Sequence, residues 1–271
     1  MKFSFGRNWL SYSESALTQE KVDTARKAFH GLMQGIELRG ARFLDIGFGQ
    51  GLPLFLAAEA GADVHGIDLD PMCAKAVEAT HGFFPGLPVP KITIASILDD
   101  SFVRIQRDEG GFDVVHTWGV LHHTGAMARA FRNAAAMVKL GGFLVISIYN
   151  RHWTSPIWLG IKYFFNLLPR FLQTTATLVS YPLFYLRARG LAGDRHEVTH
   201  RGMNLFHDVQ DWLGGYPYEY ASAEEMEQAF AALGFELVRC NRTEGYTGCN
   251  EFVFRKRSQF AENEISSGGD V

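Results

Sequence analysis

The stretch Phe43–Gly51 constrains the fold of this 271-residue chain most, because an apolar run leads directly into three glycines at alternate positions. The run contains Asp45, and the apolar, helix-prone residues 52–60 follow the glycines. Glycine permits positive φ and close approach of the backbone to a ligand, and the start of a helix offers free N–H groups. The pattern therefore predicts a strand, a tight turn and a helix that together hold a ligand.

The spacing of these glycines differs from the dinucleotide fingerprint, which needs glycines at its first, third and sixth positions. Counted from Gly47 the sixth position is Leu52, and counted from Gly49 it is Leu54. A second strand then ends in acid at Asp68, within Val64–Asp70. A NAD-dependent dehydrogenase stays an alternative that the glycine spacing opposes.

The motif Asp-x-Gly-x-Gly-x-Gly, followed by a strand that ends in acid, resembles the nucleotide-side motifs of class I S-adenosylmethionine-dependent methyltransferases. The resemblance implies that S-adenosyl-L-methionine is the cofactor. It further implies that Gly47, Gly49 and Gly51 pass against the methionine part and that Asp68 accepts the ribose hydroxyls, as a carboxylate does in NAD sites. The alternative is that Asp68 only caps a helix.

Strands and helices alternate from residue 41 to 150, which predicts a parallel sheet with its ligand at the carboxyl ends of the strands. The expected strands are Arg42–Ile46, Asp63–Ile67, Lys91–Ala95, Phe112–Thr117 and Phe143–Ile148, and a terminal hairpin of Phe235–Arg239 and Asn250–Arg255. The predicted fold is an α/β, Rossmann-like seven-stranded sheet, mostly parallel with an antiparallel C-terminal hairpin strand, plus a helical cap insertion.

The predicted organisation has four parts. Residues 1–40 form a lid or brace, with a helix over Thr18–Gly35, and residues 41–150 and 221–257 form the core. Residues 151–220 form an aromatic-rich cap that starts with a helix capped by the hydroxyls of Thr154 and Ser155, and residues 258–271 form a disordered tail.

Two later segments extend the resemblance. Residues 112–125 resemble the segment FDxVxxxxVLHH of the branch that modifies small molecules, including quinol and sugar methylases, and Leu140–Ile146 matches its fifth strand. The stretch after the third strand resembles the border of the adenine site, with Ser96 where many members have Asp. The cofactor residues implied are Asp45, Gly47, Gly49, Gly51, Asp68, Leu69, Ser96, Ile97 and Trp118.

The pocket for the methyl acceptor is expected to come from a segment before the core and from the cap that precedes its last part. Residues 201–219 and the start Phe5–Trp9 resemble a bacterial branch of the same family. If the former segment is helical, His207 and Asp211 share a face, although they could equally pair on the surface. The substrate-pocket candidates are Asn8, Trp9, His123, Asp211 and Tyr216, with simple packing as the alternative for Trp9.

Methyl transfer is an in-line displacement that depends on positioning in a dry site, and a hydroxyl acceptor must also lose its proton. Histidine is the natural base near neutral pH. The catalytic candidates are His122 and His207, and His123 is expected to be structural. Some relatives bind a divalent metal at this turn through carboxylates, but Gly119 and His122 stand at those positions here, so no metal is expected.

Composition limits the partners. A formal net charge of −3 without a long basic run argues against nucleic acid. Three cysteines without C-x-x-C spacing and a start without a signal peptide's apolar region indicate a cytoplasmic protein. The apolar stretch 156–188 predicts a lid over an apolar acceptor, an oligomer interface or a peripheral membrane contact, and it is too polar to span a bilayer.

These observations predict a cytoplasmic methyltransferase, monomeric or homodimeric, that uses S-adenosyl-L-methionine on a small-molecule or lipid-linked acceptor, through O-methylation. S- or N-methylation of a small molecule is an alternative. The non-enzyme alternative is a cofactor-binding or membrane-associated interaction protein without turnover.

Overall fold

A computed structural model describes residues 5–192, 205–243 and 248–258, together with their side chains except those of 187–192, 205 and 207. The predicted base His207 therefore lies, as a side chain, outside the described residues. Residues 244–247, between the two strands of the predicted terminal hairpin, and the predicted tail beyond Ser258 also lie outside the described residues.

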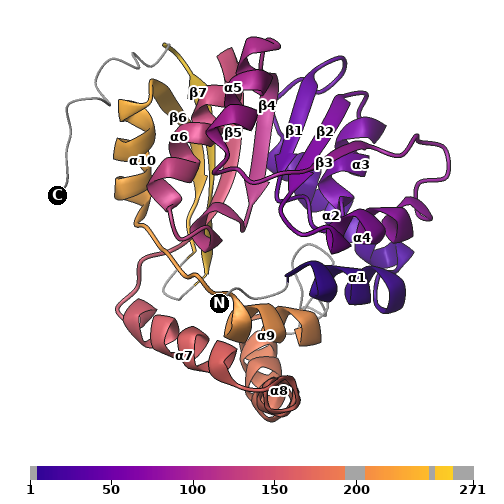
Figure 1. The fold of residues 1–271 in the computed structure, drawn as a ribbon, viewed down its shortest axis with the longest axis vertical. Helices are drawn as coiled ribbons and strands as arrows, with labels where there is room; N and C mark the ends of the chain where they lie inside the picture. Colours follow the sequence, from indigo (N-terminus) through magenta and orange to yellow (C-terminus); the bar gives the residue numbers. More distant parts are fainter. Residues whose placement is uncertain (1–4, 193–204, 244–247, 259–271) are drawn as a thin grey trace.

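One seven-stranded sheet organises the molecule in the order β3-β2-β1-β4-β5-β7-β6. Its strands are β1 Arg42–Ile46, β2 Asp63–Asp68, β3 Lys91–Ile94, β4 Phe112–Trp118, β5 Val138–Tyr149, β6 Phe235–Asn241 and β7 Cys249–Lys256. The β1, β2, β3, β4 and β5 pairings are parallel, whereas β7 runs antiparallel to both of its neighbours. The predicted fold class, including the antiparallel C-terminal strand, is confirmed (Figure 1).

Helices cover both faces of the sheet and bury two apolar clusters. On one face Phe29 of α2 (Gln19–Leu32), Phe55 of α3 (Leu52–Glu59) and Val77 of α4 (Met72–His81) pack over the sheet. On the other face Val103 of α5 (Asp100–Asp108), Ala134 of α6 (Met127–Met137) and Phe230 of α10 (Ala223–Ala232) do the same. These clusters hold the strand ends in fixed positions.

The sequence missed two local details. Strand β5 starts at Val138 rather than Phe143, because Val138 already pairs with Phe112 and the register then shifts at an irregularity. The hydroxyl of Thr154 does not cap α7 (Ser155–Leu167) but pairs with the ring of His152 at 2.7 Å from Nδ1. The expected hydroxyl cap by Thr154 is thus corrected.

The described helices between β5 and α10 form a layer beneath the carboxyl edge of the sheet (Figure 1). It contains α7, α8 (Arg170–Ala192) and α9 (Leu205–Gly214), joined by a small apolar cluster around Phe165, Val209 and Leu213. Helix α1 (Phe5–Ser15) packs on α4 and α9. Within the residues that the structure describes, no helix has the length and hydropathy needed to cross a bilayer.

The segment 1–40, predicted to be a lid or brace, divides into two parts. Helix α2, which begins after its N-cap Thr18, is built into the core on the face of the sheet. Helix α1 instead carries Phe5 and Trp9 at the wall of the main cavity. Only the first helix is therefore placed to cover a ligand.

Candidate functional site

A cavity of about 670 Å³ lies at the carboxyl ends of β1, β2 and β4, between the sheet and the helices α1 and α9. Ligand pockets commonly have this volume, and in open α/β sheets they lie at the point where the strand order reverses. That point falls beside β1, which pairs with β2 on one side and β4 on the other.

The glycine turn forms one wall of this cavity. Gly47, Gly49 and Gly51 all adopt positive φ, at 72°, 55° and 76°. A Cβ on Gly47 would come within 2.5 Å of the methyl groups of Val120, so a side chain has no room there. The sequence needs glycine here both for the left-handed backbone and for the close packing of the turn.

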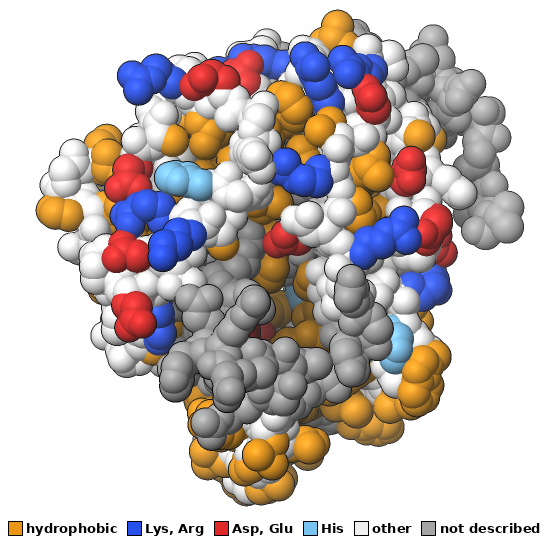
Figure 2. All heavy atoms as spheres, turned by 180° about the vertical axis from the view of Figure 1, so that it is seen from behind, with side chains coloured by type: hydrophobic (Ala, Val, Ile, Leu, Met, Phe, Trp, Pro, Cys, Tyr) orange, Lys and Arg blue, Asp and Glu red, His pale blue; other side chains and the backbone are white. Residues whose placement is uncertain are grey.

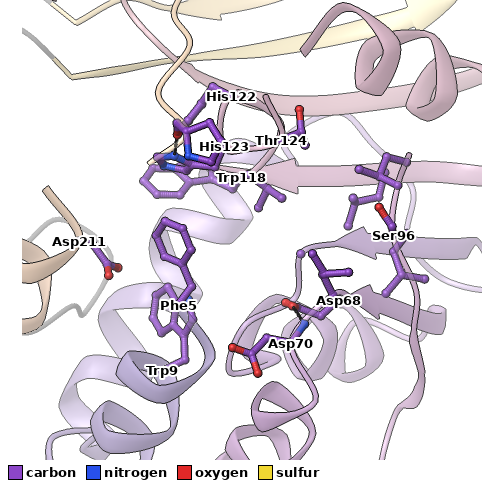
Figure 3. A pocket seen from close by; sticks show the side chains of 18 of the residues that line it. Phe5, Trp9, Asp68, Asp70, Ser96, Trp118, His122, His123, Thr124 and Asp211 are labelled. Atoms are coloured by element: carbon purple, nitrogen blue, oxygen red, sulfur yellow. Dashed lines mark hydrogen bonds between the residues drawn. The ribbon is translucent and has the colours of Figure 1, made fainter. Parts of the chain in front are cut away.

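Asp68 is fixed at the end of β2 by backbone donors. Its Oδ2 accepts the N–H of Gly49 at 3.0 Å and its Oδ1 accepts the N–H of Asp70 at 2.9 Å. Burial raises the pKa of Asp68 above its ordinary value, and these hydrogen bonds oppose the shift. The carboxylate lines the cavity and keeps further lone pairs for a diol, so it can hold ribose hydroxyls (Figure 3).

The helix-cap alternative for Asp68 is not what the structure shows. Asp70, two residues later, accepts the N–H of Met72 at the start of α4 at 3.0 Å. The other carboxylate oxygen of Asp70 accepts the N–H of Gly6 at 3.2 Å and so ties α1 to the site.

The stretch after β3 gives the cavity an apolar wall with one hydroxyl. Ser96, Ile97 and Leu98 all line it, together with the exposed side chain of Leu69. The Oγ of Ser96 accepts the N–H of Leu98 at 3.1 Å, so its hydrogen is free to be donated to a ligand. This wall suits the flat face and edge of a base.

Trp118 and the residues after it close the centre of the cavity. The indole Nε1 of Trp118 donates to Glu251 on β7 at 2.9 Å, which fixes the ring. Gly119 follows with a φ of 74° and a ligand-facing position in the wall.

Four of the sequence candidates do not line the cavity. Gly49 and Gly51 act within the turn, and Asn8 is buried behind the wall. Asp45 is buried inside the sheet, where its Oδ1 lies 2.6 Å from Nδ1 of His116 on the neighbouring strand. The side chain of Asp45 therefore contacts the neighbouring strand β4 and does not line the cavity.

The other end of the cavity is built by α1 and α9. Phe5 and Trp9 face Asp208, Asp211 and Trp212 across it. Asp211 is held through Oδ1 by the side-chain amide of Asn8 at 2.7 Å. Tyr216 also lines this end, so the candidates Trp9, Asp211 and Tyr216 meet there.

The two neighbouring histidines are held in opposite tautomers. The Nδ1 of His122 accepts the backbone N–H of Tyr149 at 3.3 Å, which leaves its hydrogen on Nε2. The Nδ1 of His123 lies 2.6 Å from the carbonyl oxygen of Pro217 and must donate to it, which leaves a lone pair on Nε2. Burial lowers the pKa of both rings, well below the ordinary value for His122 and to about 3 for His123.

This geometry argues against His122 as the base and against a purely structural role for His123. His122 is fully buried and its one lone pair is already used, so it is not arranged to remove a proton. His123, expected to be structural, is the ring with a lone pair at the cavity.

Sequence reasoning missed two titratable groups at this end, Asp208 and Lys162. Asp208 lies one helical turn before Asp211, and burial raises its pKa to about 7. Lys162 of α7 is buried among the rings of Tyr149 and Tyr218 at 5.3 and 5.1 Å from their centroids, and burial lowers its pKa to about 7. Asp208 could have been found from its i, i+3 spacing to Asp211, whereas Lys162 is a single charge in an apolar run.

Within the described ranges, no group of three or more His, Cys, Asp and Glu side chains could hold a metal ion. The donor set of the cavity instead suits an organic cofactor with a diol and a flat base.

Comparison with protein families gives a match over most of the chain. The sequence profile of the methyltransferase domain family matches residues 19–239. This range includes the glycine turn, Asp68, both histidines and the acidic end of the cavity.

Individual relatives match about half of the chain. The ubiquinone biosynthesis O-methyltransferase of Bordetella avium is 34% identical over 135 residues, 49% of this chain and 54% of that protein. The protein of the same name from Marinobacter nauticus is 33% identical over 137 residues, 50% of this chain and 56% of that protein. The chain thus spans about half the length of these relatives.

Solved structures share the fold. Magnesium protoporphyrin IX methyltransferase from Synechocystis, crystallised with bound SAH, superposes with a TM-score of 0.52 at 15% identity, covering 88% of this chain and 83% of that one. The cyclase SpnF superposes with a TM-score of 0.51 at 16% identity, covering 87% and 81%. The fold thus serves more than one chemistry, and it is the profile match over 19–239 that decides the family. This chain belongs to the methyltransferase domain family.

Proposed function

We propose that the protein is an S-adenosyl-L-methionine-dependent methyltransferase that methylates a hydroxyl oxygen of a small or lipid-linked acceptor. The observation that carries the proposal is one continuous cavity that joins the glycine turn and Asp68 at one end to the acids and aromatic rings of α1 and α9 at the other. A methyl donor and its acceptor need such a shared space, because the displacement must occur in line.

The donor end fits the cofactor by its own chemistry. Gly47 borders the methionine part with its backbone, Asp68 accepts the ribose hydroxyls, and Ser96 and Ile97 border the adenine. The bound cofactor would supply an activated methyl group on a sulfonium. The protein positions the two reactants and excludes water.

The acceptor end favours oxygen. It presents carboxyl groups and a histidine lone pair, which are acceptors for an O–H proton. The two relatives named above are called O-methyltransferases of ubiquinone biosynthesis, which supports a phenolic or quinol acceptor. The family match gives no support to a dehydrogenase, and the remaining alternatives are S- or N-methylation and binding without turnover.

Two measurements test this proposal. Calorimetric titration should give micromolar binding of S-adenosylhomocysteine and no binding of NAD. Isotope-labelled methyl groups should appear in one of a panel of catechols and quinols, or in extracted lipids, and Asp68→Ala should be inactive in the same assay. Binding of NAD instead, or no labelled product from any acceptor, would contradict the proposal.

We further propose that the α7–α8 layer contacts a lipid surface. Its exposed apolar side chains include Trp153 at 77%, Phe171 at 69%, Leu183 at 69% and Phe164 at 66% exposure. Figure 2 shows the apolar side chains gathered at this end of the molecule, with charged groups of both signs at the opposite end. Monomeric soluble proteins seldom expose apolar patches of this kind.

The lack of acidic residues in this part of the chain favours a membrane as the partner of the exposed apolar surface. Residues 114–193 contain no Asp or Glu, whereas Arg170 begins α8. An apolar helical surface with aromatic side chains and only basic residues suits the interface of an anionic bilayer.

Co-sedimentation with vesicles tests this contact. Vesicles that contain phosphatidylglycerol should bind the protein more strongly than pure phosphatidylcholine vesicles, and the triple variant Phe164→Ser, Phe171→Ser, Leu183→Ser should lose that binding while its calorimetric affinity for S-adenosylhomocysteine stays within twofold. A concentration-dependent dimer that the same variant dissolves, without vesicle binding, would show that the patch is an interface between copies instead.

A further inference from the structure

We infer that Asp211, with Asp208 beside it, accepts the proton from the acceptor hydroxyl. This inference rests on the proposed function and names the base for that same site. It replaces the histidines, which the sequence suggested, by a carboxyl pair on the cap helix α9.

The position of Asp211 suits a base. Its Oδ1 accepts the amide hydrogen of Asn8 from α1 at 2.7 Å, so the side chain is anchored. Its Oδ2 has no hydrogen-bond partner within the described part of the chain, and the residue lines the cavity. Figure 3 shows the carboxyl group directed from α9 toward Phe5 and the interior of the cavity.

The charge environment supports the same role. Burial raises the pKa of Asp211 to about 8, with a further contribution from the charge of Asp208. Since Asp208 lies one turn earlier and also faces the cavity, the two carboxyl groups exchange protons near neutral pH, and the ionised form of Asp211 is the one that accepts a proton. A base with a pKa near the working pH is the most effective one.

Five titratable groups on neighbouring elements surround Asp208 and Asp211, and Asp211 stays the best proton acceptor among them. They are Tyr12 from α1, His123 from the turn after β4, Tyr149 from β5, Lys162 from α7 and Cys249 from β7. Lys162 already donates to the carbonyl oxygen of Trp212. His123, whose pKa burial lowers to about 3, can accept a hydrogen bond but is too weak to keep a proton.

A second observation points to a ligand at this end. The Nε2 of His122 carries a hydrogen and is fully buried, yet no acceptor meets it among the described residues. His122 also belongs to the wall of the same cavity. A buried donor without a partner is costly, and an acceptor molecule with an oxygen beside its reacting hydroxyl would satisfy it.

The step balances as follows. The acceptor O–H bond breaks and its proton moves to Oδ2 of Asp211, while an oxygen lone pair forms the new O–CH₃ bond. The bond between the methyl group and sulfur breaks, and its electron pair stays on sulfur, which becomes a neutral thioether. The proton on Asp211 is later released to water.

The first test measures the carboxyl group itself and does not need turnover. In protein labelled with [γ-¹³C]Asp and bound to S-adenosylhomocysteine, one carboxyl resonance that is missing in Asp211→Asn should titrate above pH 6. If the resonance that this substitution removes titrates near pH 4, Asp211 is an ordinary carboxylate and the inference is overturned.

The second test is kinetic and uses the catechol 3,4-dihydroxybenzoate as the acceptor probe. Asp211→Asn keeps an oxygen for the hydrogen bond from Asn8, so the fold should be retained. Its kcat should fall by about 100-fold or more with the KM of the donor unchanged, Asp211→Glu should recover part of the rate, and the distant Asp108→Asn should match the wild type. A kcat of Asp211→Asn within threefold of wild type would overturn the inference.

The two proposals fail in different ways. If wild-type protein transfers no methyl group to any acceptor, the proposed function fails, and the carboxyl titration still decides whether Asp211 holds a proton near neutral pH. If wild-type protein is active and Asp211→Asn is equally active, only the base assignment fails.

Discussion

The two ends of the cavity are built by different means. At the donor end the cavity-lining groups come from the turns that follow β1, β2, β3 and β4, and backbone N–H groups from Gly49 and Asp70 fix the carboxylate of Asp68. At the acceptor end the groups are side chains from α1 and α9, which are about 200 residues apart, as the Asn8–Asp211 bond shows. The donor end is therefore fixed by the fold itself, whereas the acceptor end can change with single side chains.

The largest effect is expected at the glycine turn. Gly47→Val puts a branched residue at a φ of 72° and its Cβ within 2.5 Å of Val120. We expect loss of about 3 kcal/mol in the free energy of unfolding, measured with urea, and no detectable binding of S-adenosylhomocysteine. Unchanged binding would mean that the turn is not the donor site.

The second-largest effect is expected from Asp68→Ala. It removes a partly buried carboxylate that holds Gly49 and that we expect to hold the ribose. Because hydrogen bonds to charged groups contribute about 1.5–3 kcal/mol each, calorimetry should show at least a roughly 100-fold weaker affinity for S-adenosylhomocysteine. Asp70→Asn is the neighbouring control, and a much larger loss there would move the ribose contact to Asp70.

Asp211→Asn should change stability in the opposite direction. The pKa of Asp211 is raised from 3.8 to about 8 in the folded protein, so folding favours its protonated form. That contribution is fully present below about pH 4 and is lost as the pH rises toward 8. The variant should therefore match the wild type at pH 4 and be more stable at pH 8.5, on the order of 2 kcal/mol.

Urea unfolding at several pH values measures this difference, and Asp108→Asn serves as the exposed control. A difference between the variant and the wild type that does not change with pH would show that Asp211 has no raised pKa.

The smallest effect is expected at the adenine wall. Ser96→Ala removes one hydroxyl, which accepts the N–H of Leu98 and which we expect to donate to the ligand. A neutral hydrogen bond contributes about 1 kcal/mol, so the affinity for S-adenosylhomocysteine should fall roughly fivefold. A drop as large as that of Asp68→Ala would show that the hydroxyl also holds the loop after β3.

The sequence by itself determined the sheet and placed the glycine turn and Asp68 at the end of the cavity that we propose for the donor. Glycine spacing, Asp68 and the alternation of strands and helices are local patterns, since each depends on residues that are close in the chain. The same locality explains why the strands were placed within one or two residues, apart from the early start of β5, which depends on pairing with Phe112.

Only the tertiary structure decided the chemistry of the acceptor end. The tautomers of His122 and His123 depend on the backbone groups of Tyr149 and Pro217, and the raised pKa of Asp211 depends on burial beneath α1. The pairing of Asp45 with His116 likewise follows from the neighbouring positions of β1 and β4. Such properties arise from contacts between distant segments, so a residue's type and spacing show that it can act, whereas its neighbours decide which proton it holds.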